Sequence, residues 1–303
     1  MVTFTRIWTV LTLAIVSVAA GAPIALRAQA RERSLYVSVV NDAGAPVPDL
    51  GPSDFIVRED NVAREVLRVA PAVEPMQIAV LVDTSTQARE HISHMRQALP
   101  PFIRMLTNPG ETGARNEVAL VAFGERPQIF VEYTSNAAEL EKGVNRIWSQ
   151  QDSGAYLLDA IVEVVQGFKK REAKRPVMVA IAAEGRELSY RHHEQVNDAL
   201  RDAGAPLFAL MIGTISNDLS EEGRSRALVL DRGVSLSGGR RDQLLTAMAL
   251  SDRLKQLANE LTHQYRVTYA RPQSLIPPER VTVAATRPGL TARGTLTKDQ
   301  DRP

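Results

Sequence analysis

A run of five consecutive apolar residues, Ile78 to Val82, is the feature that most limits the folds open to this chain. Such a run, closed by polar residues, is typical of a strand buried on both faces in the middle of a parallel sheet. It ends at Asp83 and Ser85, and a helical pattern begins near Ala88. The order strand, polar turn, helix places Asp83 and Ser85 at the carboxyl edge of a sheet, where open α/β folds bind ligands.

Strand and helix patterns alternate through the middle of the chain. Apolar runs typical of buried strands lie at 118–123, 176–182 and 207–212, and helical spacing lies at 88–106, 136–149, 155–171, 190–203 and 250–265. Pro100 and Pro101 predict a kink or a break in the first of these helices. The tight turn at 124–127 predicts an antiparallel pairing of 118–123 with 129–131. Together these patterns predict an α/β fold with a doubly wound, mostly parallel sheet.

Both ends of the chain carry short segments with the period of two that is typical of strands. They lie at 35–40, 55–57 and 66–69 near the N-terminus, and at 265–269, 281–283 and 290–292 near the C-terminus. Neither end has enough strands for an independently stable sheet. We therefore predict a small β module built from residues 31–75 and 265–303, with the α/β domain, residues 76–264, inserted between its halves.

The first thirty residues differ from the rest. Arg6 precedes an uncharged stretch at 7–20, Pro23 follows, and Ala28-Gln29-Ala30 has the small-x-small pattern of a cleavage site. This pattern predicts a signal peptide over residues 1–30 and an exported, periplasmic or secreted protein with no membrane insertion after cleavage. The alternative is a retained membrane anchor, because 7–26 is free of charge.

Composition adds exclusions. The formal net charge is +1 and there is no cysteine, which is compatible with export without disulfides. Because no basic run with interleaved aromatic residues is present, a nucleic-acid partner is not expected.

The order and spacing of these segments resemble those of a known protein family. Residues 76–265 resemble a von Willebrand factor type A domain, and the flanks resemble the VWFA-related subgroup of acidobacterial proteins. The subgroup resemblance is carried by Val37–Leu50 with Ser53–Phe55, by Leu257–Tyr265 with Tyr269, and by Arg287–Gly289. It implies the Rossmann-like fold of the family and a metal-ion-dependent adhesion site at the carboxyl edge of the sheet.

The resemblance also implies which residues stand at that site. Asp83 and Ser85 match the family's Asp-x-Ser-x-Ser motif, and Gln87 occupies its third position. Ala155 stands where the family has Thr, and Glu184 where it has Asp. We therefore expect Asp83, Ser85, Gln87 and Glu184 to form the ligand-binding edge, and Asp83, Ser85 and Glu184 to be a vestigial or weak Mg²⁺ site, since Mg²⁺ needs near-octahedral oxygen ligands. In the alternative interpretation, Asp83 and Ser85 cap the next helix and satisfy loop amides.

Other motifs are incomplete. His193-Glu194 opens like a zinc helix, but Asn197 stands where the second His is needed. The segment 233–238 lacks the second glycine of a nucleophile elbow. We expect a non-enzymatic, exported protein–protein interaction or adhesion-like module with an unidentified partner outside the cytoplasm and no cofactor beyond weak Mg²⁺. The alternatives are a metal-dependent ligand binder that retains weak Mg²⁺ binding and a hydrolase with dispersed catalytic residues.

Overall fold

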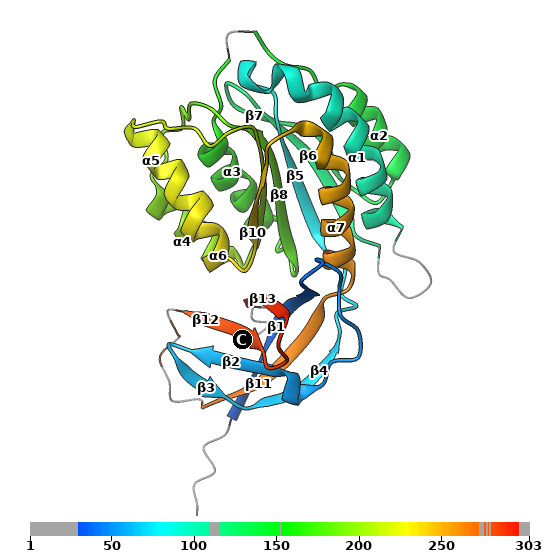
Figure 1. The fold of residues 1–303 in the computed structure, drawn as a ribbon, viewed down its shortest axis with the longest axis vertical. Helices are drawn as coiled ribbons and strands as arrows, with labels where there is room; N and C mark the ends of the chain where they lie inside the picture. Colours follow the sequence, from blue (N-terminus) through cyan, green and yellow to red (C-terminus); the bar gives the residue numbers. More distant parts are fainter. Residues whose placement is uncertain are drawn as a thin grey trace, which may run out of the picture.

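The computed structural model describes residues 30–108, 115–151, 153–272, 276, 278 and 280–296. The predicted signal segment lies outside these residues, apart from Ala30. Two units are visible in Figure 1, an α/β domain and, below it, a smaller β module containing both ends of the described chain.

The α/β domain is built on a six-stranded sheet with the order β10-β9-β8-β5-β6-β7. Its strands are β5 (Gln77–Asp83), β6 (Glu117–Phe123), β7 (Pro127–Thr134), β8 (Pro176–Ala183), β9 (Leu207–Ile212) and β10 (Arg240–Leu244). All neighbouring pairs are parallel except β6 and β7, which form the predicted antiparallel pair. The prediction of a doubly wound, mostly parallel sheet is confirmed.

Helices cover both faces of this sheet (Figure 1). One face carries α1 (Ile92–Thr107), α2 (Ala137–Asn145) and α7 (Leu250–Thr262). The other carries α3 (Leu157–Lys170), α4 (His193–Ala203), α5 (Glu221–Leu228), the π-helical turn η3 (Val229–Gly233) and α6 (Val234–Leu236). Along β5, Ile78, Val80 and Val82 pack toward the first group, and Ala79 and Leu81 toward the second. Burial on both faces explains why this strand is a continuous apolar run rather than an alternating one.

The first predicted helix, residues 88–106, differs from the prediction at its start and at its two prolines. Its beginning is a 3-10 turn, η2 (Thr86–His91), and α1 then runs without a break through Pro100 and Pro101. The prolines remove two backbone donors, but Leu99, Phe102 and Ile103 are fully buried on both sides of them. Packing on the sheet therefore holds the helix together, and no division occurs.

The β module consists of two sheets. One has the order β13-β1-β11-β4, from β1 (Ala30–Asn41), β4 (Val66–Pro71), β11 (Tyr265–Pro272) and β13 (Leu290–Leu296); the other has the order β12-β2-β3, from β2 (Phe55–Glu59), β3 (Val62–Arg64) and β12 (Val281–Ala285). Strand β1 pairs with both β11 and β13, and β2 pairs with β12. N- and C-terminal strands thus share both sheets, as predicted, and enclose a core that includes Val37, Val57 and Val267.

Polar contacts fix the two units against each other. The buried Arg175 guanidinium donates to the Glu74 carbonyl at 2.6 Å and to Gln264 Oε1 at 2.7 Å, and it lies 4.5 Å from the ring centre of Tyr36. Gln264 in turn donates to Ser38 Oγ at 2.9 Å. Because β1 packs against the end of α7 in this way, its polar face is buried as well as its apolar one. Two short helices, η1 (Pro52–Asp54) and η4 (Ala247–Ala249), complete the described elements.

Candidate functional site

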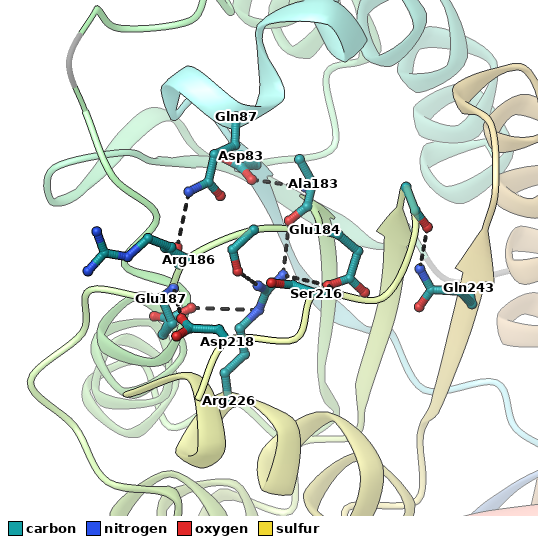
Figure 2. Close-up of polar contacts among 12 residues, drawn as sticks. Asp83, Gln87, Ala183, Glu184, Arg186, Glu187, Ser216, Asp218, Arg226 and Gln243 are labelled. Carbon is teal, nitrogen blue, oxygen red and sulfur yellow. Dashed lines mark hydrogen bonds and ion pairs between the residues drawn. The ribbon is translucent and has the colours of Figure 1, made fainter. Parts of the chain in front are cut away.

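Asp83 lies at the carboxyl end of β5 and is completely buried. Its Oδ1 accepts from the Ser85 N–H at 2.8 Å. Its Oδ2 accepts from the Ala183 N–H at 2.9 Å (Figure 2). Burial raises the pKa of the Asp83 carboxyl, while these hydrogen bonds and the positive charge of Arg226 act in the opposite direction. The side chain therefore ties β5 to β8 and already has an amide donor on each oxygen.

Near Asp83, two hydroxyl oxygens and one amide oxygen have no hydrogen-bond partner among the described residues. Among the described residues, no group hydrogen-bonds to Ser85 Oγ, Thr84 Oγ1 or Gln87 Oε1, although all three atoms are buried. Ser85 precedes η2 but makes no side-chain cap, so its part in the helix-cap interpretation is wrong. The part that assigns Asp83 to loop amides is confirmed by its two backbone bonds.

Gln87 connects two loops at this edge of the sheet, the loop after β5 and the loop after β8. Its Nε2 donates to the Arg186 carbonyl at 3.3 Å, as Figure 2 shows. A Cβ at Gly185, whose φ is +156°, would lie 2.1 Å from Gln87 Oε1. A larger residue at 185 would therefore displace the Gln87 side chain from its present position.

Ala155 is almost fully buried, and its side chain is part of the hydrophobic core between the sheet and α3. Its backbone forms a parallel bridge to Glu187, and its carbonyl accepts from the Leu188 N–H at 2.9 Å. The loop before α3 is thus attached to the loop after β8 through backbone atoms. No side-chain oxygen is available at position 155.

Glu184 follows β8 and is engaged with positive charge. Its Oε1 accepts from Arg241 Nη2 at 2.9 Å, and its Oε2 accepts from the Ser216 N–H at 3.4 Å. Arg226 Nη2 lies 3.7 Å from the same Oε2. The carboxylate is therefore neutralised by β10 and α5 rather than left free at the edge.

Arg226 is the central charge of this region and is only 4% exposed. From α5 its guanidinium donates to the Gly185 carbonyl at 2.5 Å and to the Ala183 carbonyl at 2.9 Å (Figure 2). Its Nε lies 3.7 Å from Glu187 Oε2. The positively charged guanidinium of Arg226 thus lies among the carboxylates of the loop after β8.

Glu187 is a second buried carboxyl in that loop. Its Oε1 accepts from Ser189 Oγ at 2.5 Å and from the Leu158 N–H at 3.3 Å. Burial raises the pKa of Glu187 to about 7, against the lowering effect of Ser189, Arg226 and the Leu158 amide. The group therefore changes charge near neutral pH.

The structure brings Asp83, Ser85, Gln87 and Glu184 to one edge of the sheet, as the sequence predicts, and places Ala155 beside them. Sequence reasoning missed Arg226, Arg241 and Glu187. Arg226 lies on a short helix with little amphipathic pattern, so no local signal identifies it as buried. Glu187 follows Glu184-Gly185 by two residues, which is the one sequence hint that another carboxyl belongs to this loop.

The remaining motif candidates do not assemble into a metal centre. Within the described ranges, no group of three or more His, Cys, Asp and Glu side chains is arranged to hold a metal ion. His193 is the first residue of α4. Asn197 packs against Gly233, where an added Cβ would lie 2.0 Å from its Oδ1.

The fold and this edge define a class, the α/β domains that carry their site at the carboxyl ends of a mostly parallel sheet. The family model described as von Willebrand factor type A domain matches residues 77–226. The chain contains a von Willebrand factor type A domain and belongs to that family. Among curated protein sequences, none matches this chain.

Solved structures with a related fold include proximal thread matrix protein 1 from the mussel byssus, with 14% identity, a TM-score of 0.47, and coverage of 71% of this chain and 50% of that one. The PilB minor pilin from Streptococcus sanguinis has 10% identity and a TM-score of 0.47, covering 63% and 62%. A von Willebrand factor type A protein from Catenulispora acidiphila has 11% identity and a TM-score of 0.48, covering 91% and 76%. The chain thus spans about half the length of the mussel protein.

Proposed function

We propose that this chain is an exported, non-enzymatic protein–protein interaction module of the VWFA-related type. It binds its partner through the loops at the carboxyl edge of the six-stranded sheet and needs no tightly held cation. The partner is a protein of the cell envelope or the exterior. The export part rests on the uncharged stretch at 7–20 and the Ala28–Ala30 pattern. No helix among the described residues is long and apolar enough to cross a membrane.

The observation that carries the proposal is the distribution of exposed apolar side chains. Tyr190 follows β8, Ile215 and Leu219 follow β9, and Leu245 and Met248 follow β10; all five are well exposed. These are three neighbouring strands, so the side chains gather at one edge. Clustered exposed apolar residues with a polar surround mark protein-binding surfaces.

The cation part of the proposal rests on the donor set. Both oxygens of Asp83 accept N–H groups, Ala155 offers no oxygen, and Glu184 is paired with Arg241. Arg226 adds a fixed positive charge nearby, which repels a divalent ion. These residues do not fit a tight Mg²⁺ site, which requires several free hard-oxygen ligands.

A metal-dependent ligand binder with weak Mg²⁺ affinity is the second candidate. The observation that favours it is the buried, unpartnered Ser85 Oγ beside Asp83, which is the kind of atom that a cation or a water would satisfy.

Thermal unfolding tests whether the chain holds a divalent cation tightly. A millimolar site adds only about 1.4 kcal/mol of stability at about 10 mM Mg²⁺, whereas a micromolar site adds about 5 kcal/mol. We expect the melting temperatures in EDTA and in about 10 mM Mg²⁺ or Mn²⁺ to differ by no more than a stabilisation of about 1.4 kcal/mol implies. A large rise that disappears in Asp83→Ala would contradict the proposal. The variant Gln87→Ser/Ala155→Thr/Glu184→Asp/Arg226→Gln restores the ligands and removes the fixed charge, so it should gain a cation-dependent rise.

Binding itself is tested by capture from the organism's own envelope fraction, followed by titration with the purified captured protein. We expect saturable binding that is unchanged by EDTA and weakened in Ile215→Asp/Leu245→Asp. The matched control is Val62→Asp, an exposed apolar residue of the β module. Binding that requires a divalent ion would support the second candidate. Turnover, or labelling of a surface serine by an activity-based probe, would support the hydrolase alternative.

A further inference from the structure

We propose that a groove across the edge strand β7 binds an extended peptide segment of a protein partner, one that carries an acidic side chain and, further along, a basic one. This surface is separate from the apolar loops after β8, β9 and β10. Neither Asp83, Ser85, Gln87 nor Glu184 lines it.

The groove is made of two adjoining hollows. The first, about 460 Å³, is lined by Arg96, Gln128, Phe130, Asn145, Arg146, Trp148 and Gln150. The second, about 600 Å³, is lined by Glu125, Arg126, Pro127, Gln128, Ile129, Gln150 and Glu163. They share Gln128 and Gln150, so they form one continuous depression that runs over the start of β7 from the α1 side to the α3 side.

The first hollow has two arginines and no acidic lining. Arg96 on α1 and Arg146 after α2 form no ion pair with any described residue, and the buried Arg96 Nε has no hydrogen-bond partner. A partly buried guanidinium without a partner is costly, and a carboxylate is the group that satisfies it best. The first hollow therefore suits the acidic side chain of a ligand.

Aromatic and amide groups complete this hollow. Trp148 is 59% exposed, and Arg146 lies 5.9 Å from the ring centre of Phe130. Tryptophan and arginine are both enriched among the residues that dominate binding energy at protein interfaces. The amides of Asn145 and Gln150 can bond to peptide groups of an extended segment.

The second hollow reverses the sign of the charge. Glu125 and Glu163 line it together with a single arginine, Arg126, and Ile129 is exposed there. A polyanion such as an acidic polysaccharide would meet these carboxylates along its length and be repelled. A peptide can place a lysine or arginine at this end, so the change of sign favours a peptide as the occupant.

The position of the groove on β7 supports an extended conformation for that peptide. Strand β7 is at the end of the six-stranded sheet, so no strand of the described residues pairs with its outer side. Its pairing with β6 shifts register twice, around Phe130 and Glu132. Because such irregularities shorten any regular ladder, side-chain contacts in the two hollows provide most of the specificity.

The fluorescence of Trp148 can be used to measure peptide binding in the groove. The chain has two tryptophans, Trp8 and Trp148, so the full chain carrying Trp8→Phe reports from the groove alone. The probes are synthetic Val/Thr peptides with one Asp and one Lys two, four or six positions apart, in both orders, without aromatic residues. We expect at least one of them to change Trp148 fluorescence saturably. Replacing its Asp by Asn, or its Lys by Gln, should weaken binding roughly tenfold, as the loss of one charge-assisted hydrogen bond implies.

Variants of the protein locate the site. Arg146 is exposed, so Arg146→Gln should leave the fold intact. It should weaken peptide binding roughly tenfold, and Arg96→Gln and Glu163→Gln should each do the same. Arg58→Gln, an equal change of charge on the exposed side of β2, should leave binding unaltered. Arg96→Glu should bind a peptide with Lys in place of its Asp better than the original peptide.

Three results would overturn the proposal: no saturable signal from any peptide up to millimolar concentration, equal binding of oligogalacturonate, or binding that is unaffected by Arg146→Gln and Glu163→Gln. The Ile215→Asp/Leu245→Asp variant should bind these peptides normally. Failure of the groove and failure of the carboxyl-edge proposal are therefore distinguishable.

Discussion

At the scale of single residues, the carboxyl edge is organised by Arg226. Its guanidinium donates to one backbone carbonyl at the end of β8 and one in the loop that follows, and it lies 3.7 Å from Glu184 and from Glu187. Buried carboxylates close to one another are unfavourable unless a positive charge lies among them. Arg226 thus stabilises the loop conformation by charge that the chain itself provides.

Removal of this charge should be costly. Arg226→Met leaves Glu187 buried without its counter-charge and two carbonyls without donors, so we expect the free energy of unfolding to fall by about 3–5 kcal/mol. Urea unfolding measures the change. The matched control is Arg232→Met, an exposed arginine in the following π-helical turn, where the effect should stay within about 0.5 kcal/mol. Equal stability of both variants would show that Arg226 is not an essential partner of the loop.

Glu187 predicts a dependence of stability on pH. Its pKa is about 7 in the folded protein against 4.5 for the free group, so between these pH values the folded state holds a proton that the unfolded state has released. Stability therefore decreases as pH rises from about 4.5 to about 7 and is level above, with a total effect on the order of 3 kcal/mol. Asp83 contributes in the same direction, so the comparison is with Glu187→Gln.

The measurement is the free energy of unfolding from pH 4.5 to pH 8 for both proteins. The Gln variant should show a flatter profile and gain relative to the natural chain at the upper end. Parallel profiles would mean that Glu187 ionises in the fold as it does in water.

How well the sequence predicts this site depends on how far apart in the chain its residues lie. Asp83, Ser85 and Gln87 follow a strand that is recognisable from five residues, so their position is predictable. Arg226 reaches residues 183–187 from a helix that begins at Glu221 and whose buried positions are Gly223, Ser225 and Arg226. No apolar stripe marks such a helix, and its partner loop lies some forty residues earlier in the chain.

At the scale of elements, the apolar periodicity predicts β5, β8 and β9 well, because strands buried on both faces leave continuous runs. The segment from α5 to α6, Glu221 to Leu236, was not predicted. Its helical pattern is interrupted by the π-helical turn η3, which shifts the buried face by one residue. Of the kink or break expected at Pro100 and Pro101, the break is wrong, because buried neighbours on both sides outweigh the local backbone penalty.

Helix α7 gives a test of packing at this scale. Leu257 is fully buried between α1 and the sheet, so Leu257→Ala should lower the free energy of unfolding by about 2–5 kcal/mol. Thermal or urea unfolding measures it. Lys255→Ala, on the exposed side of the same helix, should change stability little. If the two variants melt together, the helix does not pack as described.

At the scale of the whole molecule, α7 also connects the two units. The buried Glu260 accepts from Arg240 of β10 and from Arg293 Nη2 of β13, the latter at 3.0 Å. Together with Arg175 this places charged contacts on both sides of the join between the α/β domain and the β module. The prediction that the two ends of the chain share a module follows from strand counting, but these contacts depend on tertiary geometry that no local pattern reveals.

The proposed export of the chain predicts a mature N-terminus. Cleavage after Ala30 leaves Arg31, which lies in β1 opposite Arg271. N-terminal sequencing of the protein recovered from culture fluid or periplasm should therefore begin at Arg31. An intact Met1 in membrane-pelleted protein would favour the anchor alternative instead.

The pairing of β1 also sets an order of events during synthesis. Val37 pairs with Tyr265 on one side and with Gly294 on the other, so both edges of this early strand wait for the last parts of the chain. At synthesis rates of about 5–20 residues per second, that delay is roughly 10–45 s. The α/β domain can fold during this interval, while β1 remains an unpaired apolar edge open to wrong partners. A holding chaperone that covers residues 31–41 until release should therefore raise the yield of native protein more than one that binds any internal helix.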